Sequence, residues 1–174
     1  MLNYVLLPIK DRSRRFLMND ANISGDSFAL IGAVAHLMSR SPRYCSYPIV
    51  CIKEWIEPAE ALQQLKVFFD TKGDLSGYVA WAWLCEEARE AFTSDPSVRL
   101  RLSDWNGGTE LWIIDFLYSG EDLRGFLKGI SALFENVGSI FYLRRDDGGL
   151  VLKVMEWRVR SRKLIVKRLK SGST

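Results

Sequence analysis

Long apolar runs are missing from this chain of 174 residues. A membrane-spanning helix needs roughly 20 consecutive apolar residues, and no segment of the sequence approaches that length. The apolar residues at the N-terminus come before the basic ones, whereas a secretory signal has the opposite order. We therefore expect neither a transmembrane segment nor a secretion signal.

Cysteine is scarce and unpatterned. Cys45, Cys51 and Cys85 form an odd set without CxxC spacing, which favours neither a disulfide framework nor a zinc site. We interpret all three as buried, small, apolar residues. The sequence thus predicts a cytoplasmic protein without a bound metal.

Histidine occurs once, and the common catalytic motifs are missing. His36 lies within an apolar stretch, where we expect it to have a packing role. The sequence contains no phosphate-binding P-loop, no G-x-S-x-G nucleophile motif and no H-E-x-x-H metal motif. Nucleotide-binding and common hydrolase classes therefore have no support.

The amino-acid composition is typical of one globular domain. Hydrophobic residues make up 48% of the chain and aromatic residues 12%, enough for a packed core. The net charge of +3 hides a segment, residues 158–170, with seven basic residues and no acidic one. We predict an N-terminal arm (1–27), a folded domain (28–157) and a basic C-terminal tail (158–174).

Helical and strand patterns alternate along the first half of this domain. The apolar run from Ser27 predicts a buried helix that ends before Pro42, and Pro58 opens a second short helix or turn. The paired glutamates of residues 84–92 predict a surface helix. β-Branched and aromatic residues predict three strands, at 47–52, 66–70 and 77–83.

The second half predicts two hairpins and one helix. Alternation over 98–102, the Asn106–Gly107 turn and the apolar run 111–116 predict the first hairpin. An amphipathic helix follows at 119–134. Strands at 140–143 and 150–157 form the second hairpin. Six or seven mostly antiparallel strands with inserted helices make an α+β domain.

Five sequence blocks occur in the order of a known family. They are G-A-V-A-H-L-M-S-R-S-P-R-Y, G-Y-V-A-W-A-W-L, D-W-N-G-G, W-I-I-D-F and K-V-M-E-W, within residues 32–157. On these blocks the chain resembles the RTX toxin-activating lysine acyltransferases. That family moves a fatty acyl group from acyl carrier protein to a lysine of a protein toxin.

The resemblance implies a fold, a donor and partners. It implies a GNAT-like central twisted, mostly antiparallel sheet, flanked by helices and split by a V-shaped opening, in a protein that forms homodimers. It implies acyl carrier protein as the donor, through its phosphopantetheine thioester, with no other cofactor bound. The loop that wraps coenzyme A in ordinary GNAT enzymes is absent, which agrees with this donor. RTX toxins and contact-dependent inhibition toxins are both plausible substrates.

The resemblance also implies a catalytic site, with one departure. Most members have S-P-x-H in the first block, and that histidine acts with the aspartate of the W-x-I-D block. Here Asp115, Ser41 and Pro42 are present, but Tyr44 stands where the histidine should be. We take Tyr44, Asp115 and Ser41 as the candidate catalytic residues.

The chemistry assigns roles to these residues and leaves alternatives open. A lysine amine must lose a proton before it attacks a thioester, and a phenol with a pKa near 10 is a poor base but an adequate donor. Asp115 would then accept the proton and Tyr44 would act as an acid. Each residue also has a purely structural interpretation. Tyr44 would be a half-buried ring, Asp115 would form a salt bridge, and Ser41 would end the helix through a backbone hydrogen bond.

Two functions therefore compete. The first is an active lysine acyltransferase with tyrosine in place of histidine. The second is a catalytically silent relative that binds the toxin or the carrier protein. A third, weaker interpretation takes the basic tail as a nucleic-acid or membrane-surface element, but no aromatic residues alternate with its charges as they do in single-strand binders. We expect no nucleic-acid partner.

Overall fold

A computed structural model describes residues 27–70, 72–95, 97–120, 123–146, 150–161 and 163–167. Predictions for the arm at 1–26 and for the end of the tail at 168–174 lie outside these residues. The helices and strands, in chain order, are α1 (Ser27–Ser39), the π-helical turn η1 (Ile52–Ile56), α2 (Glu57–Ala61), β1 (Leu65–Phe69), β2 (Leu75–Leu84), α3 (Glu86–Ser94), the 3₁₀ turn η2 (Leu102–Trp105), β3 (Glu110–Tyr118), α4 (Leu123–Leu133), β4 (Ser139–Arg145), β5 (Val151–Arg158) and β6 (Lys163–Lys167).

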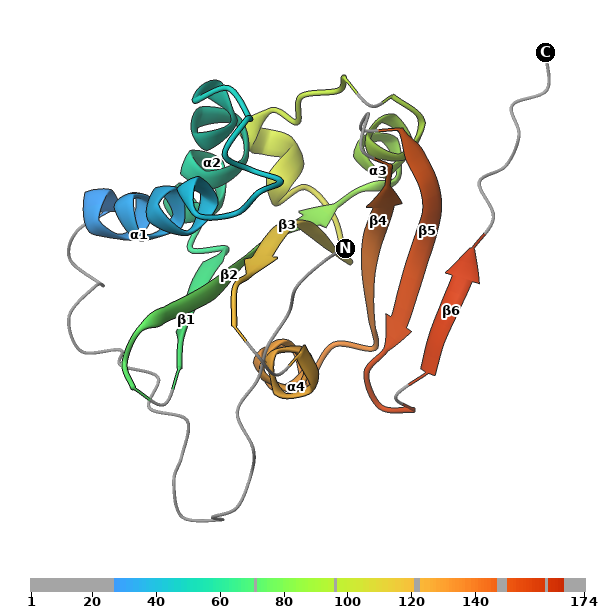
Figure 1. Cartoon of the computed structure of the whole chain (residues 1–174). Helices are drawn as coiled ribbons and strands as arrows, with labels where there is room; N and C mark the ends of the chain where they lie inside the picture. Colours follow the sequence, from blue (N-terminus) through green and yellow to red (C-terminus); the bar gives the residue numbers. More distant parts are fainter. Residues whose placement is uncertain are drawn as a thin grey trace. The chain divides into compact units, whose positions relative to one another are not determined.

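The strands form one six-stranded sheet in the order β1-β2-β3-β4-β5-β6 (Figure 1). The pairs β1–β2, β4–β5 and β5–β6 are antiparallel, and β3–β4 is parallel. This confirms the predicted α+β, mostly antiparallel fold. The described residues belong to two compact units, one of residues 27–80 and 115–133 and the other of residues 81–114 and 134–167. Strands β2 and β3 continue from one unit into the other.

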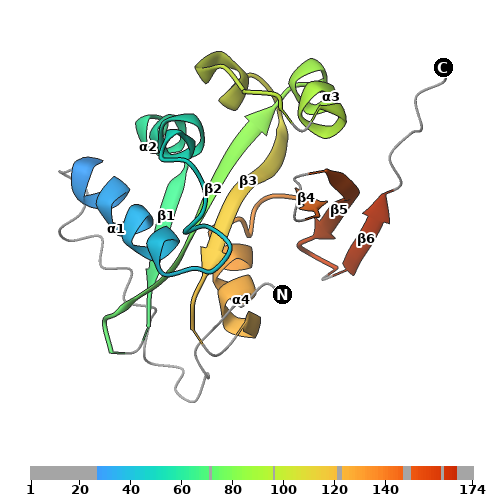
Figure 2. The same cartoon turned by 45° about the horizontal axis from the view of Figure 1, so that its top comes forward.

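The first unit places helices on two faces of its strands. Val67 pairs with Tyr78, so these side chains share one face of the β1–β2 ladder. Phe68 and Gly77 form the other face, where the rings of Phe68 and Phe126 of α4 meet at 5.0 Å. The helical elements α1, η1 and α2 pack together beside β1 (Figure 2). Tyr78 therefore points away from α4.

Helix α1 is less buried than the sequence predicts. Val34, Leu37 and Met38 are buried, but Phe28 is 84% exposed. His36 is also exposed, so the expected packing role for this histidine is wrong. The buried residues recur at helical spacing only in the C-terminal half, which packs on the elements that follow.

The predicted strand at 47–52 is wrong. The N–H of Cys51 donates to the carbonyl of Pro48, and that of Ile52 to the carbonyl of Ile49, so the segment turns into η1. Strand propensity of β-branched residues is a weak preference that packing overrides. Here the helical path buries Cys51 and Ile56 on one side.

The predicted hairpin at 98–102 is also wrong. The side chain of Asp104 accepts hydrogen bonds from the backbone N–H and the guanidinium of Arg101, which caps the 3₁₀ turn η2. This turn buries Trp105 completely. The N–H of Gly108 then donates to the carbonyl of Trp83 at the end of β2. The D-W-N-G-G block thus docks a loop on β2 rather than turning a hairpin.

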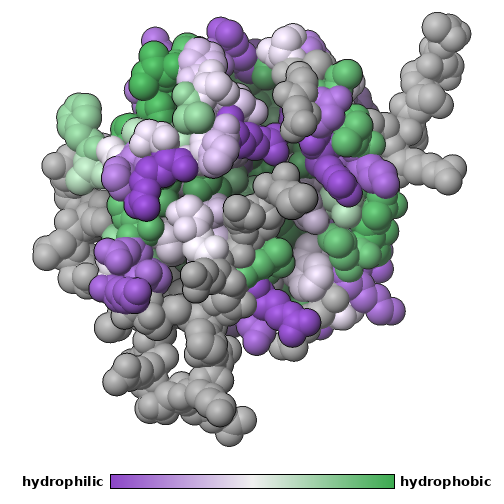
Figure 3. Space-filling view, viewed as in Figure 1, coloured by the Kyte–Doolittle hydropathy of each residue, from purple (hydrophilic) through white to green (hydrophobic). Residues whose placement is uncertain are grey.

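The other predicted elements of the second unit are confirmed, and one is new. The β4–β5 hairpin and α3 form close to their predicted ranges. Strand β6, within the predicted basic tail, pairs with β5 and ends the sheet. Apolar side chains reach the surface over β5 and β6 (Figure 3), where Leu164 and Val166 are 50% and 51% exposed.

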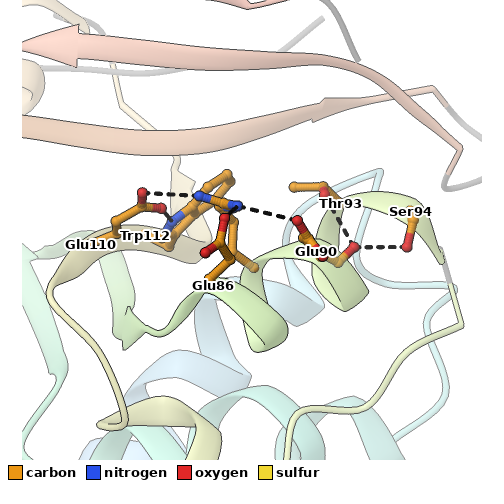
Figure 4. A network of polar contacts seen from close by, with 7 residues as sticks. Glu86, Glu90, Thr93, Ser94, Glu110 and Trp112 are labelled. Atoms are coloured by element: carbon orange, nitrogen blue, oxygen red, sulfur yellow. Dashed lines mark hydrogen bonds and ion pairs between the residues drawn. The ribbon is translucent and has the colours of Figure 1, made fainter. Parts of the chain in front are cut away.

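A polar network fixes α3 against β3 in this unit. The guanidinium of Arg89 contacts Glu86 at 2.8 Å and Glu110 at 3.2 Å (Figure 4). The second carboxylate oxygen of Glu110 accepts the indole N–H of Trp112 at 3.1 Å. These contacts account for Glu86, the first of the paired glutamates of the surface helix.

Candidate active site

The turn after α1 presents Tyr44. The N–H groups of Tyr44 and Cys45 donate to the carbonyl of Ser41 at 3.1 and 2.9 Å, and the N–H of Ser41 donates to the carbonyl of Met38. Ser41 therefore shapes the turn through its backbone, which agrees with the helix-stop interpretation. Its predicted donation to an acyl carbonyl stays a prediction.

Tyr44 and Asp115 lie in direct contact. The Tyr44 hydroxyl donates to Oδ1 of Asp115 at 2.5 Å and lies 3.3 Å from the carbonyl oxygen of Phe116. Both side chains are half-buried. The structure thus brings together the two main residues that the sequence analysis selected, from positions 71 residues apart.

A second phenol completes the site. The hydroxyl of Tyr78, on β2, donates to Oδ2 of Asp115 at 2.5 Å. Tyr78 is 0% exposed. Tyr78 was not among the residues predicted from the sequence. The available signal was a tyrosine in the apolar block at 77–84, because a buried phenol needs a hydrogen-bond partner.

Burial sets the electrostatics of the three groups. Burial raises the pKa of Asp115, and the hydrogen bonds from Tyr44 and Tyr78 oppose that rise without cancelling it. Burial and the neighbouring Asp115 carboxylate raise the pKa of both Tyr44 and Tyr78 well above the ordinary value for a phenol. The resting site therefore holds two protonated phenols and a carboxylate that binds protons more readily than usual.

Arg43 and an aromatic row border the site. Partial burial of its guanidinium lowers the pKa of Arg43, but a hydrogen bond with Tyr47 and the neighbouring Tyr44, Tyr47 and Asp115 raise it overall. The rings of Tyr44 and Tyr47 lie 5.2 Å apart, and those of Tyr47 and Trp55 lie 5.9 Å apart. The row provides apolar surface that leads away from Asp115.

The cysteines differ from the prediction. Cys51 is buried as expected, and burial followed by the charge of Asp115 raises the pKa of its thiol, which makes it a poor nucleophile. Cys45 is exposed and Cys85 only partly buried, so the expectation of three buried cysteines is wrong.

Within the described residues, no three His, Cys, Asp or Glu side chains gather in a way that would hold a metal ion. Nor is any helix among the described residues long and apolar enough to cross a membrane.

The arrangement provides a path for a proton. A phenol oxygen that donates its own proton to a carboxylate keeps lone pairs that accept a proton from a third group. A nitrogen next to Tyr44 would pass its proton to the Tyr44 oxygen while the Tyr44 proton moves to Asp115. The pair is thus suited to general acid–base chemistry on an amine.

Comparisons with known proteins find relatives among the lysine acyltransferases. The sequence profile of the RTX toxin acyltransferase family matches residues 23–158. The chain is 28% identical over 130 residues to the RTX-II toxin-activating lysine-acyltransferase ApxIIC of Actinobacillus pleuropneumoniae, which covers 72% of this chain and 80% of that protein.

Two further relatives carry the name of the group they transfer. The protein-lysine myristoyltransferase RtxC of Kingella kingae is 28% identical over 132 residues, which is 76% of this chain and 77% of that protein. The protein-lysine palmitoyltransferase CyaC of Bordetella bronchiseptica is 27% identical over 140 residues, which is 78% of this chain and 73% of that protein.

Proposed function

This chain belongs to the RTX toxin acyltransferase family, and from that membership we propose that it transfers a fatty acyl group to a lysine of a bacterial protein toxin and thereby activates the toxin. The observation that carries the proposal is the hydrogen bond between Tyr44 and Asp115. These residues stand at the two positions where the family resemblance puts the catalytic histidine and aspartate.

The reaction begins with a neutral amine. The target lysine loses one proton to solvent, and its nitrogen attacks the thioester carbon of the donor. The nitrogen now carries a positive charge and the former carbonyl oxygen a negative one. We assign to Arg43 the stabilisation of this oxyanion, because its guanidinium belongs to the same site and stays charged.

Tyr44 and Asp115 then move one proton. The attacking nitrogen gives a proton to the Tyr44 oxygen as the Tyr44 proton passes to Oδ1 of Asp115. When the carbon–sulfur bond breaks, the same proton returns through Tyr44 to the leaving thiolate. The products are an amide on lysine and a free thiol, and the site recovers its resting protonation.

The donor is an acyl carrier protein that carries the acyl group on its phosphopantetheine thiol. The family resemblance supports this donor, and so does the absence from the sequence of the loop that wraps coenzyme A. The names of the relatives support chains of the myristoyl or palmitoyl class. The toxin is of the RTX or contact-dependent inhibition type, and the reaction takes place in the cytoplasm.

The protein acts as a homodimer in this proposal. Among the described residues β6 is the last strand of the sheet, and an edge strand offers backbone groups for pairing with a second chain. Leu164 and Val166 add exposed apolar surface on that strand. Edge pairing between two copies would satisfy the backbone groups and place the apolar side chains of the two β6 strands beside one another.

A reconstituted transfer tests the proposal. The purified protein is mixed with palmitoyl-acyl carrier protein and RTX-II toxin, and lysine acylation is read by peptide mass spectrometry. The ApxIIC relative serves as the positive control. We expect acylated lysine with the wild type and transfer slower by about 10²–10⁴-fold with Asp115→Asn.

One observation favours a second candidate, a silent relative that only binds. It is the phenol of Tyr44 at the histidine position. If the wild type transfers nothing and Tyr44→His creates transfer in the same assay, the second candidate is correct.

A further inference from the structure

Both oxygens of Asp115 are held by phenols of very different accessibility. Tyr44 lies on the turn after α1 and is half-buried, whereas Tyr78 lies in β2 and is 0% exposed. Each hydroxyl is 2.5 Å from its own carboxylate oxygen. A substrate at this site therefore meets Tyr44, while Tyr78 acts only through Asp115.

A glycine allows this placement of Tyr78. A Cβ atom on Gly77 would lie 2.6 Å from the carbonyl oxygen of Leu117 and 2.8 Å from the ring of Tyr118. Only a residue without a side chain lets β2 run this close to β3. The next residue, Tyr78, points to the opposite face, where Asp115 lies two positions before Leu117.

Fixing the second oxygen matters because a carboxylate rotates easily. The terminal torsion of aspartate has a broad, two-fold distribution, so a carboxylate bound at one oxygen exchanges its two oxygens. A second donor on a buried ring prevents this exchange. It also stabilises the negative charge, since a hydrogen bond from Tyr78 lowers the pKa of Asp115 against the effect of burial.

We propose that Tyr78 is a positioning residue that holds Oδ2 of Asp115 in the core and leaves Oδ1 to Tyr44 for proton transfer. The catalytic role of Tyr78 rests on the proposed acyl transfer. The effect of Tyr78 on the pKa of Asp115 does not depend on that function, so an experiment can contradict either claim without the other.

The first test measures Asp115 alone. The protein is labelled with ¹³C-aspartate, and the Asp115 carboxyl signal is followed by NMR against pH. The groups that face this carboxylate are Tyr44 and Arg43 from the turn, Cys51 from the segment before η1, and Tyr78 from β2. Tyr78→Phe keeps the ring and removes one donor, so the midpoint should move to higher pH.

Tyr118→Phe is the matched control. It removes a hydroxyl from the same strand as Asp115 but on the opposite face, where the ring lies 4.9 Å from Phe126. The midpoint should stay unchanged in this variant. An unchanged midpoint in Tyr78→Phe overturns the proposal. In the wild type, the Tyr78 hydroxyl proton should give a slowly exchanging downfield signal that Asp115→Asn removes, and its absence also overturns the proposal.

The second test is a double-mutant cycle on acyl transfer. Tyr78→Phe should lower kcat by about 10- to 100-fold, the range for a lost hydrogen bond to a charged group, with KM unchanged. In the Asp115→Asn background it should have no further effect. Equal losses in both backgrounds mean that Tyr78 does not act through Asp115. If Tyr78→Phe shifts the titration midpoint of Asp115 but the wild type transfers no acyl group, the proposed function is wrong. The positioning of Asp115 by Tyr78 is then still supported.

Discussion

The hydroxyl of Tyr44 lies 2.5 Å from Oδ1 of Asp115, and this contact joins the turn after α1 to strand β3. In the proposed mechanism, a phenol stands where the family resemblance puts an imidazole, and it keeps a direct contact with the aspartate. This phenol changes which group is proposed to accept a proton. A phenol with a raised pKa is no base at neutral pH, so the carboxylate behind it takes that role.

Replacing Asp115 should separate activity from stability. Asp115→Asn removes the proton acceptor, and we expect acyl transfer to fall by about 10²–10⁴-fold, as for other general bases. The pKa of Asp115 is raised in the folded protein, so its ionisation costs stability as pH rises through that pKa. The melting temperature of Asp115→Asn, relative to that of the wild type, should therefore rise from acid to neutral pH.

Asp95 provides a control of opposite sign. Hydrogen bonds from Ser97 lower the pKa of Asp95, so its ionised form stabilises the fold. Asp95→Asn should lower the melting temperature at neutral pH, and the loss should shrink as pH falls through the lowered pKa. Parallel curves for the two variants would show that burial does not raise the pKa of Asp115.

The pH dependence of transfer should reflect the missing imidazole. In the wild type, the rate should fall at acid pH as Asp115 binds a proton, and it should keep rising towards alkaline pH as the lysine amine becomes neutral. Tyr44→His should level off near neutrality, because the histidine titrates there. Tyr44→Phe should lose about 10²–10⁴-fold. Full activity in Tyr44→Phe would remove Tyr44 from the mechanism.

The sequence could predict the Tyr44–Asp115 pair because both residues stand in blocks that match a family. Tyr78 escaped because its partner is 37 residues away and only the folded strands bring them together. Hydrophobic periodicity predicted β2, β3, α3 and the β4–β5 hairpin. In these segments the local pattern and the packing of the folded chain favour the same structure.

Periodicity failed where a specific contact outweighed it. Residues 98–102 alternate like a strand, but the bond between Arg101 and Asp104 and the burial of Trp105 impose a 3₁₀ turn. Strand β6 was hidden because its basic residues looked like a solvated tail. Strand β6 forms because its backbone pairs with β5, and the local sequence pattern does not predict that pairing.

Docking of the acyl carrier protein should depend on basic residues near β6. Arg160 and Lys163 are exposed, and acyl carrier proteins are acidic. The double variant Arg160→Gln with Lys163→Gln should raise KM for the acyl donor about two- to tenfold at low ionic strength, and less at high salt. Lys53→Gln with Lys72→Gln removes the same charge from exposed positions of the other unit and should leave KM unchanged. Equal KM values for both pairs would exclude this docking surface.

Dimer formation should depend on the apolar side chains of β6. Leu164→Glu with Val166→Glu places charges on the edge strand, and we expect a monomer in light scattering after size exclusion. Leu102→Glu alters a comparably exposed leucine outside the sheet and should leave the dimer intact. A dimer that survives the β6 changes would place the interface elsewhere.

The intact mass of an RTX-type toxin co-expressed with this protein tests the central claim most directly. With the wild type, the account predicts one or more long-chain acyl increments, mapped to lysine by peptide analysis. With Asp115→Asn, made in equal amount and folded, it predicts a toxin that carries the unmodified mass in much the larger part. Equal acylation of the toxin by the wild type and by Asp115→Asn would contradict the account, as would an unmodified toxin with the wild type where a known relative modifies it.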